Sequence, residues 1–124
     1  MKQEFLSKAK ENLKIARISF EQECYNACAN RAYFAAFQAA IAALADKGIQ
    51  NRKNDHAWVQ SEFNRRLIKN RKVYPDKMKT YLLNMQDVRN HADYSVEKIG
   101  KKLAGRQLGR ADEMIMSIGK ELGE

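Results

Sequence analysis

The first segment of the chain carries apolar residues in steps of three and four. Such positions fall on one side of a helix, opposite charged residues such as Lys8 and Lys14. The apolar positions are Leu6, Ala9, Leu13, Ala16 and Phe20. The pattern predicts an amphipathic surface helix.

The stretch from about Tyr25 to Lys47 is far more apolar and predicts a buried central helix. Its large apolar residues also follow helical spacing: Tyr33, Phe37, Ile41 and Leu44. Many of its other positions are alanines: Ala35, Ala36, Ala39, Ala40 and Ala43. Because alanine lets another backbone approach closely, we expect this helix to serve both the internal core and a partner subunit. Gly48 is expected to end the helix in the left-handed conformation.

A third helix is expected to begin near His56. Asn54 or Asp55 precedes it, and either side chain can accept a hydrogen bond from a free amide at a helix start. The apolar residues then recur every four positions, at Val59, Phe63 and Leu67. The pattern predicts a regular helix with one buried stripe.

Two more helices complete the expected fold. Pro75 fits the first turn of the fourth, because the missing amide hydrogen is no loss there. The apolar ridge of that helix is Met78, Leu82, Met85, Val88 and Ala92. The last helix, from about Lys101 to Leu122, carries Leu103, Leu108, Ala111, Ile115 and Ile118. We therefore predict an all-α fold, a bundle of about five helices forming one domain over residues 1–124.

Positive charge is concentrated in the middle of the chain. Lys and Arg total 23 against 15 Asp and Glu, a formal net charge of +8. Residues 51–80 alone hold nine basic side chains, Arg52, Lys53, Arg65, Arg66, Lys69, Arg71, Lys72, Lys77 and Lys79, against Asp55, Glu62 and Asp76. This sign suits a partner that carries phosphates or acidic groups. The alternative is a solvated face that keeps the protein soluble.

Several classes of protein are disfavoured by the sequence. No run reaches the roughly 18 apolar residues of a membrane span, and the first residues lack the features of a secretory signal. We expect a cytoplasmic protein with no membrane partner. Cys24 and Cys28, four residues apart on a helix, are poorly placed to bond each other and are expected to be buried. With His56 and His91 far from them, we expect no metal site and no cofactor.

A polar cluster stands at the end of the fourth helix, in the run QDVRNHADYS. It contains Asp87, Arg89, Asn90, His91, Asp93 and Tyr94. This run and the stretch NRAYFAAFQAAIAAL, from Asn30 to Leu44, resemble the small single-domain members of the HEPN family. The likeness extends to the loop after Gly48 and to a His at the start of the third helix with Phe63 behind it.

The resemblance implies an antiparallel up-and-down helix bundle that forms a homodimer, with the fourth-helix motifs of both subunits at one cleft. Many HEPN proteins are metal-independent endoribonucleases, often toxins paired with a nucleotidyltransferase antitoxin. Others have lost catalysis and serve as binding partners.

The family's ribonuclease motif is an Arg, a polar residue and a His after four to six intervening residues. Arg89 and Asn90 match the first two elements, and the His position falls on Tyr94, Ser95 or Val96. The nearby His91 is two residues from Arg89, about 200° around a regular helix, so the two should point apart. The catalytic candidates are therefore Arg89, Asn90 and Tyr94, with His91 and Asp93 as further candidates.

Each of these residues also has a structural interpretation. Arg89 can hold a phosphate, or it can pair with Asp93 four residues on. Asn30 and Arg31 can face the same cleft from the central helix, or Arg31 can extend along apolar surface. Arg65, Arg66 and Lys69 are candidates for RNA or nucleotide binding.

Three hypotheses follow for the function. The first is a HEPN homodimer of the toxin–antitoxin or defence type that cleaves or binds RNA. The second is a non-catalytic module that binds a nucleotide or docks a nucleotidyltransferase. The third is a helical dimer whose polar cluster only holds it together.

Overall fold

Five α-helices make up most of the chain in the computed structural model, which describes residues 1–51 and 53–124. They are α1 (Lys2–Glu21), α2 (Tyr25–Asp46), α3 (His56–Glu62), α4 (Tyr81–Tyr94) and α5 (Lys101–Glu121). A π-helix, η1 (Phe63–Asn70), and a 3-10 helix, η2 (Asp76–Thr80), lie between α3 and α4. No strand occurs in the described residues, so the predicted all-α class is confirmed.

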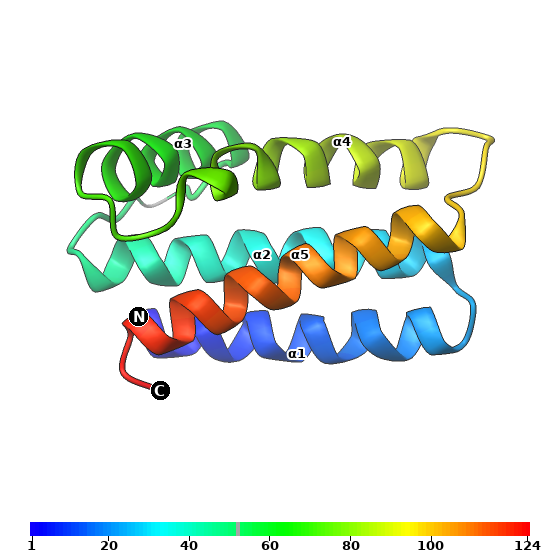
Figure 1. Cartoon of the computed structure of the whole chain (residues 1–124), viewed down its shortest axis with the longest axis horizontal. Coiled ribbons are helices and arrows are strands. Elements are labelled where there is room, and N and C mark those ends of the chain that lie inside the picture. Colours follow the sequence, from blue (N-terminus) through cyan, green and yellow to red (C-terminus); the bar gives the residue numbers. More distant parts are fainter. Residues whose placement is uncertain (52) are drawn as a thin grey trace.

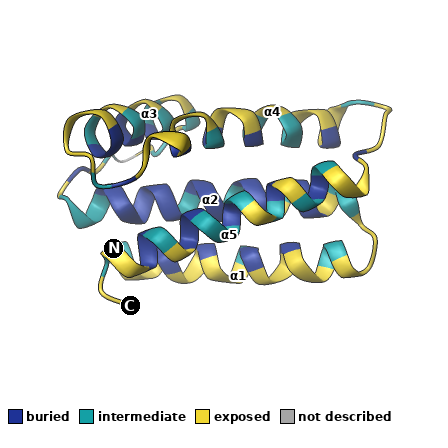
Figure 2. Ribbon diagram, in the orientation of Figure 1, coloured by how far each residue is buried: buried dark blue, intermediate teal, exposed yellow. Residues whose placement is uncertain are grey.

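Helix α2 is the centre of the fold. It contacts each of the other four α-helices, and Figure 1 shows it running between α1 and the layer formed by α3 and α4. Its surface is buried over most of its length (Figure 2), as expected for a helix that is apolar on all sides.

The alanines of α2 are enclosed by the chain itself. Each is 0% exposed: Ala35, Ala36, Ala39, Ala40 and Ala43. The prediction that they also offer a surface to a partner subunit is therefore wrong, because neighbouring helices of the same chain already cover them.

A short turn at residues 22–24 joins α1 to α2. Lys2, at the beginning of α1, lies 2.8 Å from Asp46, at the end of α2, so the two helices run in opposite directions. Cys24 lies in this turn and is exposed, which corrects the prediction that both cysteines are buried. Cys28, one turn into α2, is buried, and burial raises its thiol pKa to about 11.

The third helix is less regular than predicted. Asp55 caps α3 as expected, accepting a hydrogen bond from the Trp58 amide at 2.9 Å. From Phe63 onward the chain widens into η1, and the Arg71 amide bonds the Arg66 carbonyl five residues back at 3.1 Å. This wider turn directs the apolar side chains of η1, including Phe63 and Leu67, into the core.

The fourth helix also begins differently from the prediction. Pro75 precedes the 3-10 turn η2, and regular α-helix starts only at Tyr81. Helix α4 then packs its predicted ridge inward, with Leu82, Met85 and Ala92 buried. None of the described helices has the length and apolar character needed to cross a bilayer.

Candidate functional site

Asp93 joins α4 to α2 at a polar cluster near the end of α4. Its Oδ2 accepts a hydrogen bond from Asn30 Nδ2 at 3.0 Å and lies 3.0 Å from Arg89 Nε. The Arg89 Nε–H does not point at this oxygen, so the two side chains attract as charges without a hydrogen bond. The predicted spacing of Arg89 and Asp93 therefore does bring them together. Their side chains remain 18% and 25% exposed, so the pair is not fully buried.

The guanidinium of Arg89 is held in a defined orientation. Its Cζ lies 5.0 Å from the centre of the Phe34 ring, and its Nη1 donates to Asn90 Oδ1 at 3.2 Å. Nη2 has no hydrogen-bond partner among the described residues. A partly exposed guanidinium with an open edge is suited to receive a phosphate oxygen.

A second cluster lies beside Arg89 and connects three helices. The ring of His56 stacks on that of Phe37, with centroids 4.4 Å apart, and its Nδ1 hydrogen-bonds the hydroxyl of Tyr33. Gln60 Nε2 contacts the same hydroxyl at 3.3 Å and Gln86 Oε1 at 2.8 Å. Side chains of α2, α3 and α4 thus form one hydrogen-bonded chain.

The proton affinities of this second cluster are shifted by burial and by Arg89. Burial lowers the pKa of His56, the positive charge of Arg89 lowers it further, and Asp55 opposes both. Burial also raises the pKa of Tyr33 to about 12. At neutral pH both groups are therefore uncharged.

Some predicted site residues lie apart from Arg89. Tyr94, at the end of α4, is 79% exposed, and His91 is also exposed. No hydrogen bond between either residue and Arg89 occurs in the described chain. Arg31 faces away from the cluster and donates to Asn12 Oδ1 at 3.2 Å, near α1.

Ion pairs neutralise part of the basic middle segment. Arg65 and Arg66 both contact Glu62, at 2.7 and 3.2 Å. Lys77 lies 3.0 Å from Glu113 on α5. The net charge of this segment is therefore less available to a ligand than the sequence suggests.

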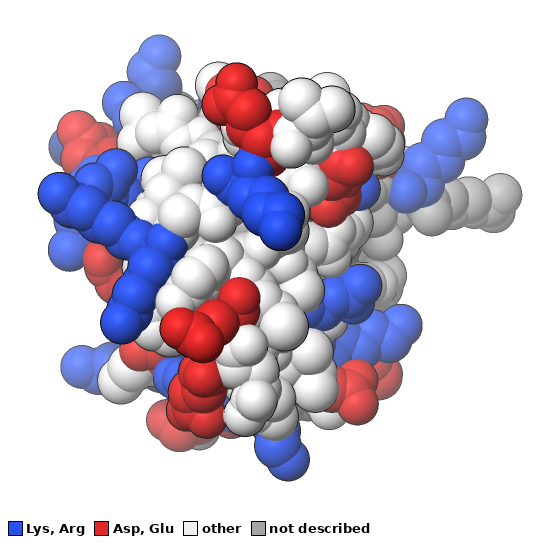
Figure 3. All heavy atoms as spheres, turned by 90° about the vertical axis from the view of Figure 1, so that its right-hand side faces the viewer, with Lys and Arg blue, Asp and Glu red and all other residues white. Residues whose placement is uncertain are grey.

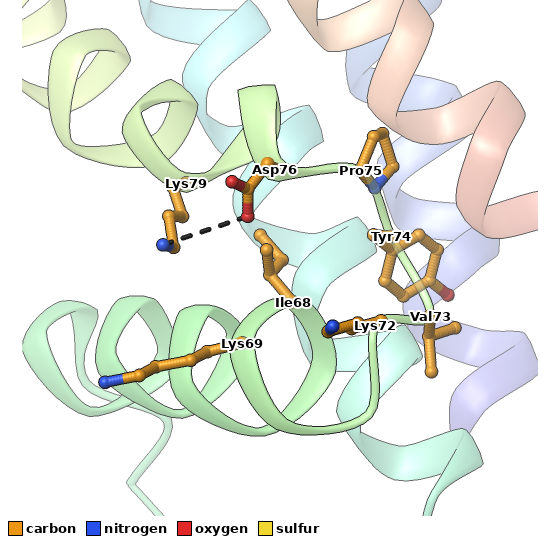
Figure 4. Close-up of a pocket in the computed structure, with 8 residues that line it drawn as sticks. All are labelled: Ile68, Lys69, Lys72, Val73, Tyr74, Pro75, Asp76 and Lys79. Carbon is orange, nitrogen blue, oxygen red and sulfur yellow. Dashed lines mark ion pairs between the residues drawn. The ribbon is translucent and has the colours of Figure 1, made fainter.

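Three lysines line a hollow between η1 and η2. It has a volume of about 540 Å³, and Lys69, Lys72 and Lys79 line it (Figure 4). Lys72 points toward the hollow, whereas Lys79 faces Asp76 at 3.8 Å. A second hollow, of about 500 Å³, shares Lys69 and Lys79 and continues to Arg65. We call these two together the basic groove.

The end of the molecule that carries the C-terminus of α4 has a mixed surface. Basic and acidic side chains alternate there with uncharged ones (Figure 3). Any attraction of a polyanion to Arg89 therefore depends on local contacts more than on one broad positive face.

Sequence reasoning missed the partners of the second cluster. The sequence places Tyr33 among the large apolar residues of the central helix and His56 at the start of the third helix, and neither position indicates a hydrogen-bonded pair. A usable signal was present, because the hydroxyl of a tyrosine buried in an apolar helix needs a hydrogen-bond partner. The identity of that partner, 23 residues away, depends on tertiary packing.

Comparison with curated proteins gave no match. A family model described as "HEPN domain" matches residues 3–122, which is nearly the whole chain. The helical fold and the resemblance in α2 and α4 agree with that match. The chain therefore belongs to the HEPN domain family.

Proposed function

We propose that this HEPN protein, of the toxin–antitoxin or defence type, binds RNA through a site centred on Arg89. One observation carries the proposal: the guanidinium is oriented by Asp93 and Phe34, yet its Nη2 edge has no partner in the described chain. The basic groove supplies a second region of positive charge, suited to contacts with neighbouring phosphates.

The geometry favours binding over cleavage. A metal-independent ribonuclease needs a group that accepts the proton of the ribose 2′-hydroxyl while a cation stabilises the phosphate. Arg89 suits the second task. The residue expected to perform the first is replaced by Tyr94, Ser95 or Val96, and Tyr94 makes no hydrogen bond to Arg89.

Binding is expected to depend on salt, because each neutralised phosphate releases counterions. The proposal is tested by measuring the affinity of the protein for labelled single-stranded RNA between about 50 and 200 mM salt. We predict that Lys69→Gln combined with Lys72→Gln makes the slope of log affinity against log salt concentration shallower. The change should correspond to the loss of about one to two phosphate contacts.

The matched control replaces two exposed lysines at the start of α5, Lys101 and Lys102, by Gln. This control changes the net charge equally but lies outside the basic groove. If the affinity does not change with salt, or if it falls equally in both double variants, the charge of the basic groove would serve solubility and not RNA binding.

We further propose that the protein acts as a homodimer in which α4 faces its partner. Leu83 is 55% and Tyr94 79% exposed, and eleven residues make about three helical turns, so both lie on one side of α4. The same side of α4 also carries the exposed Asp87. Arg89, two residues from Asp87 and about 200° around α4, lies on another side of the helix, so each subunit would keep its own Arg89 site.

Sedimentation equilibrium at micromolar concentration is expected to report about twice the chain mass of 14.3 kDa. Leu83→Glu should shift the protein to the monomer, because a charge would then be buried at the interface. The control Met116→Glu, at a 68% exposed residue on α5, should remain dimeric. A monomer at all concentrations would contradict the proposed dimer.

A second candidate function is docking of a nucleotidyltransferase. Two exposed residues favour it: Tyr94, at the end of α4, is 79% exposed, and Val96, just after the helix, is 101% exposed. Exposed apolar side chains that lie together often mark an interaction surface. Val96→Asp would then disrupt such a complex and leave RNA affinity unchanged. If Val96→Asp instead weakens RNA binding and leaves such a complex intact, RNA would be supported as the ligand.

A further inference from the structure

His56 has one ring nitrogen fixed within the protein and one facing out. Nδ1 hydrogen-bonds the hydroxyl of Tyr33. Nε2 makes no hydrogen bond with the described residues, and it is not among the enclosed polar atoms. The ring itself is half-buried and stacked on Phe37. Its outer edge is therefore presented in a fixed direction.

The hydrogen-bond chain behind His56 determines where its proton lies. The amide nitrogen of Gln60 has two hydrogens, one directed to Gln86 Oε1 at 2.8 Å and one to the Tyr33 oxygen at 3.3 Å. The Tyr33 oxygen accepts from Gln60, and among the described residues Nδ1 of His56 is the acceptor within reach of its own hydrogen, so Tyr33 donates to His56. A neutral imidazole that accepts at Nδ1 carries its hydrogen on Nε2.

Phe34 places this donor near Arg89. The Phe34 ring lies 6.1 Å from the His56 ring and 5.0 Å from Arg89 Cζ, so both groups flank one aromatic side chain. The positive charge of Arg89 also lowers the pKa of His56, as expected of neighbouring groups. Two outward-facing donors thus adjoin the same surface.

We infer that His56 is an uncharged phosphate ligand, donating from Nε2 to the RNA phosphate bound at Arg89, and that Tyr33 and Gln60 are positioning residues that fix its tautomer. This inference rests on the proposed function. Arg89 supplies the positive charge, and His56 supplies a directed hydrogen bond. The class of ligand is a phosphodiester.

The surroundings of His56 oppose a charged imidazole. Protonation would put hydrogen on Nδ1, so Tyr33 would have to turn its hydroxyl away from its acceptor. Burial and Arg89 lower the pKa of His56 below its ordinary value of 6.5, and only Asp55 acts in the other direction. The folded protein is therefore the poorer proton acceptor, and this contribution to stability, present above pH 6.5, is lost as the pH falls.

The test compares two substitutions of His56 in the whole chain with labelled single-stranded RNA as the probe. His56→Ala is expected to weaken binding by about tenfold, the effect of one hydrogen bond to a charged group. His56→Gln should stay within about threefold of the native affinity, because its amide offers a neutral donor. Circular dichroism confirms that both variants are folded.

A second readout reports the tautomer directly. Nitrogen NMR of His56 should show hydrogen on Nε2 in the native protein and a mixture of tautomers in Tyr33→Phe, with weaker RNA binding. Tyr25→Phe, at a half-buried tyrosine that begins α2, should change neither the tautomer nor RNA binding. A structural role alone for Tyr33 would leave the tautomer unchanged.

The possible failures can be told apart. If Arg89→Ala abolishes binding while His56→Ala does not, the proposed function stands and the inference is wrong. If the native protein does not bind RNA, both are wrong. If His56→Gln loses as much as His56→Ala and native binding strengthens as the pH falls through 6, His56 acts as a cation, which overturns the inference.

Discussion

Replacing Arg89 by Ala is expected to weaken RNA binding by about 10- to 100-fold and to leave the fold intact. A hydrogen bond to a charged group contributes about 1.5–3 kcal/mol, which gives this range. The loss of stability should be only on the order of 1 kcal/mol, because Asp93 is partly exposed and keeps its hydrogen bond from Asn30. The RNA affinity of Arg89→Lys should fall between those of the native protein and Arg89→Ala, since lysine keeps the charge but lacks the planar guanidinium.

The matched control for this substitution is Arg106→Ala, at an exposed arginine of α5. It should change affinity by less than about twofold, the small effect of one exposed charge on another helix. Two outcomes would contradict the role of Arg89. One is an Arg89→Ala protein that binds RNA as well as the native chain. The other is a protein that unfolds, which would make Arg89 a structural partner of Asp93.

The largest loss of stability is expected from Phe63→Ala, at about 3–5 kcal/mol of the free energy of unfolding. Phe63 is 0% exposed at the start of η1, and its ring stacks on Tyr74 with centroids 5.3 Å apart. Removing it leaves a cavity where η1 meets the core. Urea denaturation followed by circular dichroism measures the change.

An exposed apolar residue provides the comparison for Phe63. Met116→Ala, at a residue 68% exposed on α5, should change the free energy of unfolding by less than about 0.5 kcal/mol. A cost below about 1 kcal/mol for Phe63→Ala would mean that η1 repacks freely. In that case the π-helix would not be part of the stable core.

The long helices could be predicted from the sequence because their apolar period is local. The expected limits of α2 and α5 differ from the observed ones by one residue. The π-helix η1 could not be foreseen, since Val59, Phe63 and Leu67 also fit a regular helix. Tertiary contacts decide between the two forms, including those that η1 makes with α2 and with η2.

The candidate site also combines contacts that the sequence predicts with contacts that it does not. Arg89 and Asp93 are one turn apart, so their contact follows from helix geometry. The contact of Asn30 with Asp93 spans 63 residues of sequence, and that of His56 with Tyr33 spans 23. Such pairs require the relative positions of three helices, which no local pattern specifies.

The basic segment shows a further limit of sequence reasoning. Counting charges predicts nine basic side chains over residues 51–80, but it does not reveal their partners. In the described chain, Arg65, Arg66, Lys77 and Lys79 have acidic neighbours within 4 Å. Lys69 and Lys72, which line the basic groove, form no such pair there, so their replacement tests the charge of that groove.

The central claim is that an RNA phosphate contacts the guanidinium of Arg89. The most direct measurement follows the side-chain nitrogen signals of all arginines by NMR while single-stranded RNA is added. The account predicts that the Arg89 signals shift most and saturate with the RNA, while those of Arg106 stay in place. Saturating shifts confined to other arginines, with the Arg89 signals unmoved, would contradict it.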